Sequence, residues 1–171
     1  MNIYDGRFDK KAYATNHTLS VISSGRIGEG KQDHMTIRKN GREDWSLFYC
    51  EAGKLYFEDC VLEAGQGWGY APNVPQKYTM YSKDKTIYHY LHFTGSDVTE
   101  LLSSLGISLS YPIEVKSSSF SGVLDSIQNS ILEDSSLSKL SAEYHTLHLL
   151  SMLVRRSAHF SEVHMMKRVT D

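Results

Sequence analysis

The feature that most constrains the fold is a change of period at Gly95. Before it, short apolar runs alternate with Gly, Asn, Asp and Pro, a punctuation typical of closely spaced β-strands. After it, apolar residues recur at the spacings of three and four that indicate helices. A barrel or sandwich followed by helices is therefore predicted. The predicted strands are 18–24, 34–38, 45–50, 54–58, 60–63, 67–71, 76–81 and 86–93.

Three helices are predicted after the strands. The first covers 96–105 and stops at Gly106, because glycine is favoured just past a helix end. A short extended piece at 111–115 separates it from a second helix at 118–133, and the longest helix covers 138–160, with Ser138 as a candidate cap.

The third predicted helix has two apolar stripes. Leu149, Leu150 and Leu153 lie beside the first stripe, which comprises Leu140, Tyr144, Leu147, Ser151, Val154 and Ala158. A helix packed on a single surface shows one stripe. Two explanations remain open: the helix is buried on both sides within its own domain, or one stripe forms a dimer seam.

Charge and cysteine content exclude several classes of protein. The chain has 18 Lys and Arg against 20 Asp and Glu, and this balance argues against nucleic-acid binding by the segment itself. No signal peptide and no membrane-spanning run is evident. Cys50 and Cys60 are therefore expected to be reduced thiols in a cytoplasmic protein.

Strand alternation separates the residues of 86–93 into two faces. Tyr88, Tyr90 and His92 share one face, and the other carries His89, Leu91 and Phe93. Tyr combines a flat apolar ring with a hydroxyl group, so a face rich in Tyr is typical of a binding cavity. It is equally typical of a β-sheet core, and His92 is expected to be a core histidine rather than a pH switch.

Four pieces in register resemble the sensor domain of AraC-type transcription regulators. They are Arg38, then DWSLFYCEAGKLYFED, then LEAGQGWGYAPNVPQKY with its Gly-to-Pro spacing, and YHYLHFTG. The resemblance implies a cupin-like β-barrel of jelly-roll type and a homodimer. The implied divisions are an N-terminal arm at 1–17, the barrel at 18–95, a helical dimerisation segment at 96–160 and, at 161–171, the start of a linker to an absent helix-turn-helix domain.

The resemblance implies a small-molecule effector inside the barrel, for which a sugar is one candidate, and contact with DNA only through the missing domain. The matching ligand-binding positions are Arg38, Tyr78, Tyr88 and Tyr90. Aromatic faces suit the C–H surface of a sugar, and a guanidinium fork suits a hydroxyl pair or a carboxylate. The predicted dimerisation residues are Leu147, Leu150 and Val154.

A structural alternative stays open for these residues. The tyrosines could be buried residues of the barrel core, and Arg38 could form a surface ion pair with Glu43 or Asp44. In that case bulky side chains fill the barrel and the protein is a dimerisation module without a ligand. Trp68 and Tyr70, in a Gly-rich strand, are expected to be core residues.

An enzyme is not expected. Metal-dependent cupins resemble this fold but carry a His-x-His pair and a Glu on early strands, where this chain reads EAGKLYFED, and another His where this chain has Gln76. His145 and His148 lack a carboxylate at suitable spacing, and Cys50 has no evident His partner. No catalytic residue, metal site or cofactor is therefore predicted, and a cupin enzyme such as a sugar isomerase is the remote alternative.

Overall fold

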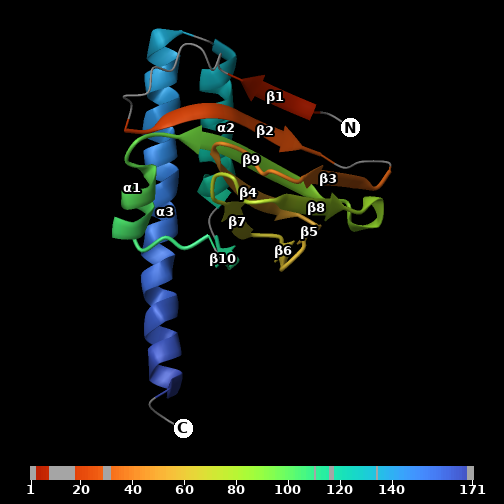
Figure 1. Ribbon diagram of the computed structural model, residues 1–171, viewed down its shortest axis with the longest axis vertical. Coiled ribbons are helices and arrows are strands. Elements are labelled where there is room, and N and C mark those ends of the chain that lie inside the picture. Colours follow the sequence, from red (N-terminus) through yellow and green to blue (C-terminus); the bar gives the residue numbers. More distant parts are fainter. Residues whose placement is uncertain are drawn as a thin grey trace.

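The computed structural model describes most of the chain, with only the backbone given at 3–7, 118 and 154–168. It covers residues 3–7, 18–28, 32–109, 111–115, 118–133 and 135–168. Within these residues, two antiparallel sheets face each other and the long helices lie to one side (Figure 1). The predicted fold class, mainly β with C-terminal helices, is confirmed.

The larger sheet has the strand order β1-β2-β9-β4-β7-β10. Its strands are β1 (Ile3–Arg7), β2 (Ser20–Ile27), β4 (Trp45–Ala52), β7 (Gln66–Tyr70), β9 (Ile87–Thr94) and β10 (Ile113–Glu114). The central strands β4 and β9 pair antiparallel, so that Phe48 lies opposite Tyr90.

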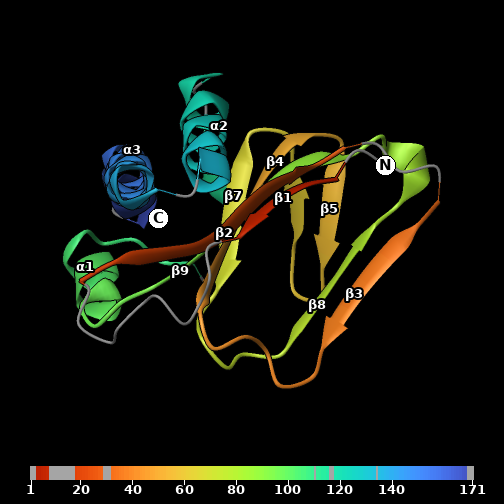
Figure 2. The ribbon, with the colours of Figure 1, turned by 90° about the horizontal axis from the view of Figure 1, so that it is seen from above.

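The smaller sheet has the order β3-β8-β5-β6 and forms the opposite wall of an open β-barrel (Figure 2). Its strands are β3 (His34–Arg38), β5 (Lys54–Phe57), β6 (Val61–Glu63) and β8 (Gln76–Met80). A single 3₁₀ turn, η2 (Ser82–Asp84), leads from β8 into β9. The chain therefore passes from one wall of the barrel to the other just before the strand that carries Tyr88 and Tyr90.

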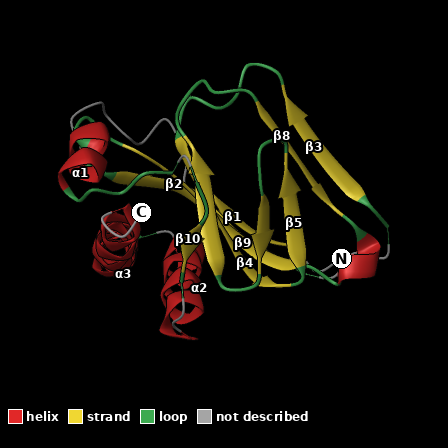
Figure 3. Ribbon diagram, turned by 90° about the horizontal axis from the view of Figure 1, so that it is seen from below, coloured by secondary structure: helices red, strands yellow, loops and turns green. Residues whose placement is uncertain are grey.

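Two long helices cover the outer face of the larger sheet and leave the smaller sheet bare (Figure 3). They are α2 (Ser118–Glu133) and α3 (Ser136–Arg168), which pack on each other. A short helix, α1 (Val98–Ser104), follows the last barrel strand. Figure 1 shows that the end of α3 extends beyond the sheets.

Strand alternation gives the larger sheet two cores, as β4 illustrates. Phe48 and Cys50 point between the two sheets, into what we call the inner core. Leu47 and Tyr49 point toward α2 and α3, into the outer core. Both sets are buried, and burying one such side chain fully contributes about 1.5–3 kcal/mol. The sheet is therefore held from both faces.

Most element ends lie within one to three residues of the predicted ones, and the larger differences concern the N-terminal arm and the third helix. The N-terminal arm, predicted to be irregular, contains strand β1, which pairs with β2; residues 8–17 lie outside the described part. The third helix begins at Ser136 and continues to Arg168 rather than ending at 160, and 169–171 lie outside the described part.

The cap of the third helix is Ser135 rather than Ser138. Ser135 Oγ accepts a hydrogen bond from the Ser138 backbone N–H at 3.0 Å, and Ser138 Oγ accepts one from the Ser135 N–H at 2.7 Å. This reciprocal pair satisfies two N–H groups that the helix itself leaves without partners.

Position 95, where the sequence period changes, needs a glycine because the backbone of Thr18 passes close to it. Its φ is +151°, and a Cβ there would lie 2.2 Å from the Thr18 carbonyl oxygen. Only glycine lets the end of β9 cross the start of β2 so closely. Strand β9 therefore ends where the sequence period changes.

Candidate functional site

Arg38 lies at the end of β3 and faces the interior between the sheets. Its Nη1 donates hydrogen bonds to Gln76 Oε1 at 3.3 Å and to the Tyr78 hydroxyl at 3.2 Å. Both partners come from β8, which pairs with β3 so that Arg38 lies opposite Gln76. Arg38 Cζ lies 6.0 Å from the Tyr78 ring centroid, within cation–π range.

The alternative surface ion pair of Arg38 is not formed. Asp44 pairs instead with Arg42, whose Nη2 donates to Asp44 Oδ2 at 2.8 Å. Among the residues that the structure describes, no carboxylate lies within 4.0 Å of the Arg38 guanidinium. A half-buried guanidinium whose described partners are neutral is suited to bind an anionic or hydroxylated group by donating hydrogen bonds to it.

Tyr88 and Tyr90 face Arg38 and Tyr78 from the opposite sheet. The predicted alternation is confirmed, because both belong to the inner core while Leu91 lies in the outer core. The Tyr78 and Tyr88 ring centroids are 6.5 Å apart. Burial, followed by the neighbouring Tyr78 and Tyr90, raises the pKa of Tyr88, so its hydroxyl remains protonated and able to donate.

A chain of buried polar groups, which the sequence did not predict, continues from Arg38 into the larger sheet. Gln76 Nε2 donates to Ser46 Oγ at 3.3 Å, and Ser46 Oγ lies 3.1 Å from His92 Nδ1. His92 Nδ1 is also 3.8 Å from Asp44 Oδ1. These groups satisfy one another because leaving any of them unpaired in the interior would be costly.

His92 is held neutral within that chain. Burial, followed by the charge of Arg42, lowers the pKa of His92 to about 3. Its imidazole therefore carries no charge near neutral pH and acts as a hydrogen-bonding group. The expectation that His92 is a core histidine agrees with this environment.

Behind these residues, the other face of the larger sheet forms an ionic contact near α2. Arg26 donates two hydrogen bonds of 2.9 Å to Glu51, and His89 Nε2 lies 2.8 Å from Glu51 Oε2. The Arg26 guanidinium, aided by His89, holds the pKa of Glu51 down at about 2. The charge of Asp125, on α2, acts on both Arg26 and His89.

The middle of the barrel is filled with aromatic rings. The Phe48 ring lies 5.0 Å from Tyr78 and 5.3 Å from Phe57, and Phe57 lies 4.4 Å from Trp68. Trp68 and Tyr70 are buried core residues, as predicted. Any ligand of Arg38 must therefore lie beside these rings, at the mouth of the barrel, unless the rings move.

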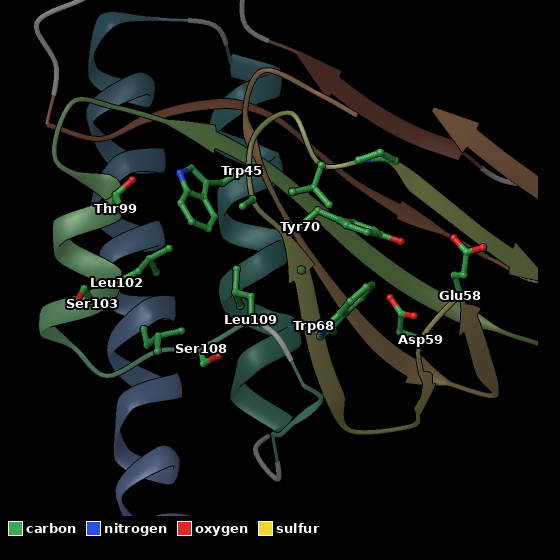
Figure 4. A pocket seen from close by; sticks show the side chains of 15 residues that line it. Trp45, Glu58, Asp59, Trp68, Tyr70, Thr99, Leu102, Ser103, Ser108 and Leu109 are labelled. Atoms are coloured by element: carbon green, nitrogen blue, oxygen red, sulfur yellow. The ribbon is translucent and has the colours of Figure 1, made fainter. Parts of the chain in front are cut away.

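A hollow of about 610 Å³ lies elsewhere, between β7, the β7–β8 loop and the segment around α1 (Figure 4). None of the four predicted ligand-binding residues lines it. It is lined by Trp45, Glu58, Asp59, Trp68, Gly69, Tyr70, Ala71, Val74, Pro75, Thr99, Leu102, Ser103, Ile107, Ser108 and Leu109. Sequence reasoning missed it because its walls come from four separate segments.

The structure separates the predicted dimerisation residues. Leu147 is 46% exposed and belongs to an exposed apolar stripe on α3, together with Leu137, Leu140 and Tyr144. Leu150 is 1% exposed and packs in the outer core of its own chain. The side chain of Val154 lies outside the described part. Of the two stripes, the one with Leu140 and Leu147 is therefore available to a partner.

Metal-ligating side chains lie apart from one another in the described part of the chain. There, no three His, Cys, Asp or Glu side chains gather in a way that could hold a metal ion. None of the described helices is both long and apolar enough to cross a membrane.

No protein family profile and no curated protein matches the chain. Similar solved structures include YhaK from Escherichia coli, 13% identical over 67% of this chain and 52% of that one, with a TM-score of 0.44. The AraC-like transcriptional activator CuxR is 12% identical over 83% and 52%, with a TM-score of 0.45. ToxT from Vibrio cholerae O395 is 15% identical over 78% and 53%, with a TM-score of 0.41.

This chain spans about half the length of each of those three structures.

Proposed function

We propose that this chain is the effector-sensing and dimerising domain of an AraC-type transcription regulator, and that Arg38 binds the effector at the mouth of the barrel. The role is non-enzymatic and cytoplasmic, with DNA contacted by a further domain. The single observation that carries the proposal is the Arg38 guanidinium, which faces inward and, among the described residues, has only the neutral Gln76 and Tyr78 as hydrogen-bond partners.

The chemistry around Arg38 indicates a small hydroxylated or anionic effector. Arg38 can donate to two oxygens of one carboxylate or of neighbouring hydroxyls. The half-buried Tyr90 ring, on the facing sheet, can pack against C–H groups. A sugar or sugar acid satisfies both requirements, and a sugar remains one candidate.

Strand β9 offers a path from effector to helices. Tyr88 and Tyr90 face the proposed site, whereas Leu91 and Phe93 on the same strand pack in the outer core with α2 and α3. A ligand that shifts β9 therefore changes packing on both sides of one strand. Coupling of this kind requires that the two packings differ in affinity for the ligand.

The test is ligand-induced stabilisation of this chain against a panel of sugars and sugar acids. A ligand at 100 times its Kd stabilises the native state by about 2.7 kcal/mol, which raises the Tm of a domain of this size by roughly 5–10 °C. Arg38→Ala should abolish the shift. Lys77→Ala, which removes an exposed cation from the neighbouring strand β8, is the matched control and should retain it.

The exposed stripe on α3 supports the homodimer. Leu137, Leu140, Tyr144 and Leu147 recur at spacings of three, four and three on one face, the pattern of a helix seam. Leu140→Asp should therefore give a monomer in sedimentation. A wild-type-like dimer from this variant would contradict the proposed seam.

The filled inner core favours a second candidate function, a dimerisation module without an effector. Phe48, Phe57, Trp68 and Tyr78 occupy the centre of the barrel with ring centroids 4.4–5.6 Å apart in successive pairs. This candidate predicts that no panel compound raises the Tm in an Arg38-dependent way, while Leu140→Asp still dissociates the dimer.

A further inference from the structure

The hollow beside α1 lies at a part of β7 that lacks a strand on one side. β4 pairs with β7 along Gln66–Tyr70, but β10 pairs only with Gln66 and Gly67. Along Trp68–Tyr70, the described residues provide no second strand partner, and the hollow occupies that position. Its volume of about 610 Å³ falls within the usual range for small-molecule sites, about 300–1,000 Å³.

One end of the hollow is mainly apolar, although the hydroxyl side chains of Thr99, Ser103 and Ser108 also lie there (Figure 4). Figure 4 shows Trp45, Leu102 and Leu109 at this end, contributed by β4, α1 and the segment that follows α1. Trp68 and Tyr70, in the middle of the same view, add two further aromatic rings. A ligand here therefore needs a sizeable apolar body, because such a lining offers contact area and few hydrogen bonds.

The charges that line the hollow are all negative. Glu58 and Asp59 lie at the end opposite Trp45 in Figure 4, and no Lys, Arg or His is among the lining residues. Lys77 Nζ approaches Glu58 Oε1 only to 4.0 Å, and at least half of each side chain is exposed. Carboxylates together with Trp and Tyr faces favour a cation and disfavour an anion.

The wall of the hollow also holds a donor without an acceptor. Trp68 is buried, and its Nε1 has no hydrogen-bond partner among the described residues. Buried polar atoms are rarely left in this state. Because this Nε1 atom is enclosed by protein, a ligand in the hollow could reach it only if the Trp68 ring moved, so the proposed ligand needs no acceptor for it.

We propose that this hollow binds an organic cation that has an apolar, preferably aromatic, body. The cation lies toward Glu58 and Asp59, and the apolar body lies against Trp45, Leu102 and Leu109. This site is separate from Arg38, whose positive charge selects the opposite kind of ligand.

A matched pair of probes tests the charge requirement. Benzoylcholine contains an aromatic ring, an ester carbonyl and a quaternary ammonium, and 3,3-dimethylbutyl benzoate replaces the ammonium nitrogen with carbon. The chain has two tryptophans, and both line the hollow, so their two indole N–H signals in ¹H–¹⁵N spectra report binding directly. We expect benzoylcholine to bind about tenfold more tightly than its neutral counterpart.

Three variants complete the test. Glu58→Gln with Asp59→Asn should give the two probes equal affinity. Ser103 is an exposed residue of α1 that lines the hollow, so Ser103→Phe should fill the hollow and abolish the response of the indole signals to benzoylcholine. Ser104 is exposed but lies outside the lining, so Ser104→Phe should leave that response unchanged.

Three results would overturn the proposal. They are equal affinity of the two probes for the wild type, indole signals that do not respond saturably, and indole signals that respond equally in Ser103→Phe. Arg38→Ala should leave the benzoylcholine titration intact. Failure at this hollow is therefore distinguishable from failure of the proposed Arg38 site.

Discussion

Leu150 and Leu140 lie on the same helix but in opposite environments, so truncating each to alanine should have very different effects. Leu150 is 1% exposed in the outer core, and Leu140 is 63% exposed. Removing a buried leucine side chain to Cβ costs about 2–5 kcal/mol, from lost transfer free energy and from the cavity left behind. An exposed leucine changes the stability of a monomer by about 0.5 kcal/mol at most.

The magnitude for Leu150→Ala follows from its surroundings. It packs in a cluster with Phe120, Leu149 and Leu153, contributed by two helices that are held against a sheet. Such a site cannot collapse easily around a void, so we expect the upper part of the range, about 3–4 kcal/mol. For a domain of this size, that corresponds to a fall in Tm of roughly 6–16 °C.

Urea unfolding followed by circular dichroism measures both variants. It should be carried out at several protein concentrations, because dissociation of a dimer makes the midpoint depend on concentration. Leu150→Ala should lower the midpoint at every concentration, with an unchanged slope. Leu140→Ala should lower it only where the wild type is dimeric. Equal losses from the two variants at the lowest concentration would refute the assignment of the two faces of α3.

Three further predictions concern the rest of the chain. Glu51→Gln should lower the free energy of unfolding by a constant amount above pH 4.5, and the loss should shrink as the pH falls toward 2. The reason is that the pKa of the Glu51 carboxyl is lowered from 4.5 to about 2 in the folded protein. A constant difference between the variant and the wild type across this pH range, measured by acid titration, would contradict the Arg26–Glu51 contact. Ser135→Ala should cost about 1 kcal/mol in urea unfolding, whereas no loss would show that the α3 cap is unimportant. Gly95→Ala should lower the Tm strongly, since its Cβ would lie 2.2 Å from the Thr18 carbonyl oxygen; a wild-type Tm would show that this crossing can relax.

The sequence predicted the strands well because turn residues and alternation are local signals. Strand 34–38 and helix 118–133 have the predicted bounds, and the faces of the last barrel strand are as expected. The inward direction of Arg38 follows from the same alternation, since Thr36 on that face is half-buried while Ile37 is exposed.

Other features depend on contacts between distant segments and could not be read locally. Periodicity revealed two stripes on the third helix, but only packing decides that Leu150 is buried and Leu147 exposed. The link from Gln76 through Ser46 to His92 joins residues 30 and 46 positions apart. Strand β1 lacked the apolar pattern that would have identified it within the arm.

Because β9 presents a different set of side chains to each core, it fixes the register of the larger sheet. A slip of one residue would reverse every side chain on the strand. Phenol groups from Tyr88 and Tyr90 would then press against the helices, and Leu91 and Phe93 would enter the barrel in place of the hydroxyl-bearing rings. Both changes would raise the free energy of a sheet in which β9 is shifted by one residue. The correct register of β9 therefore helps to set the positions of the neighbouring strands β2 and β4.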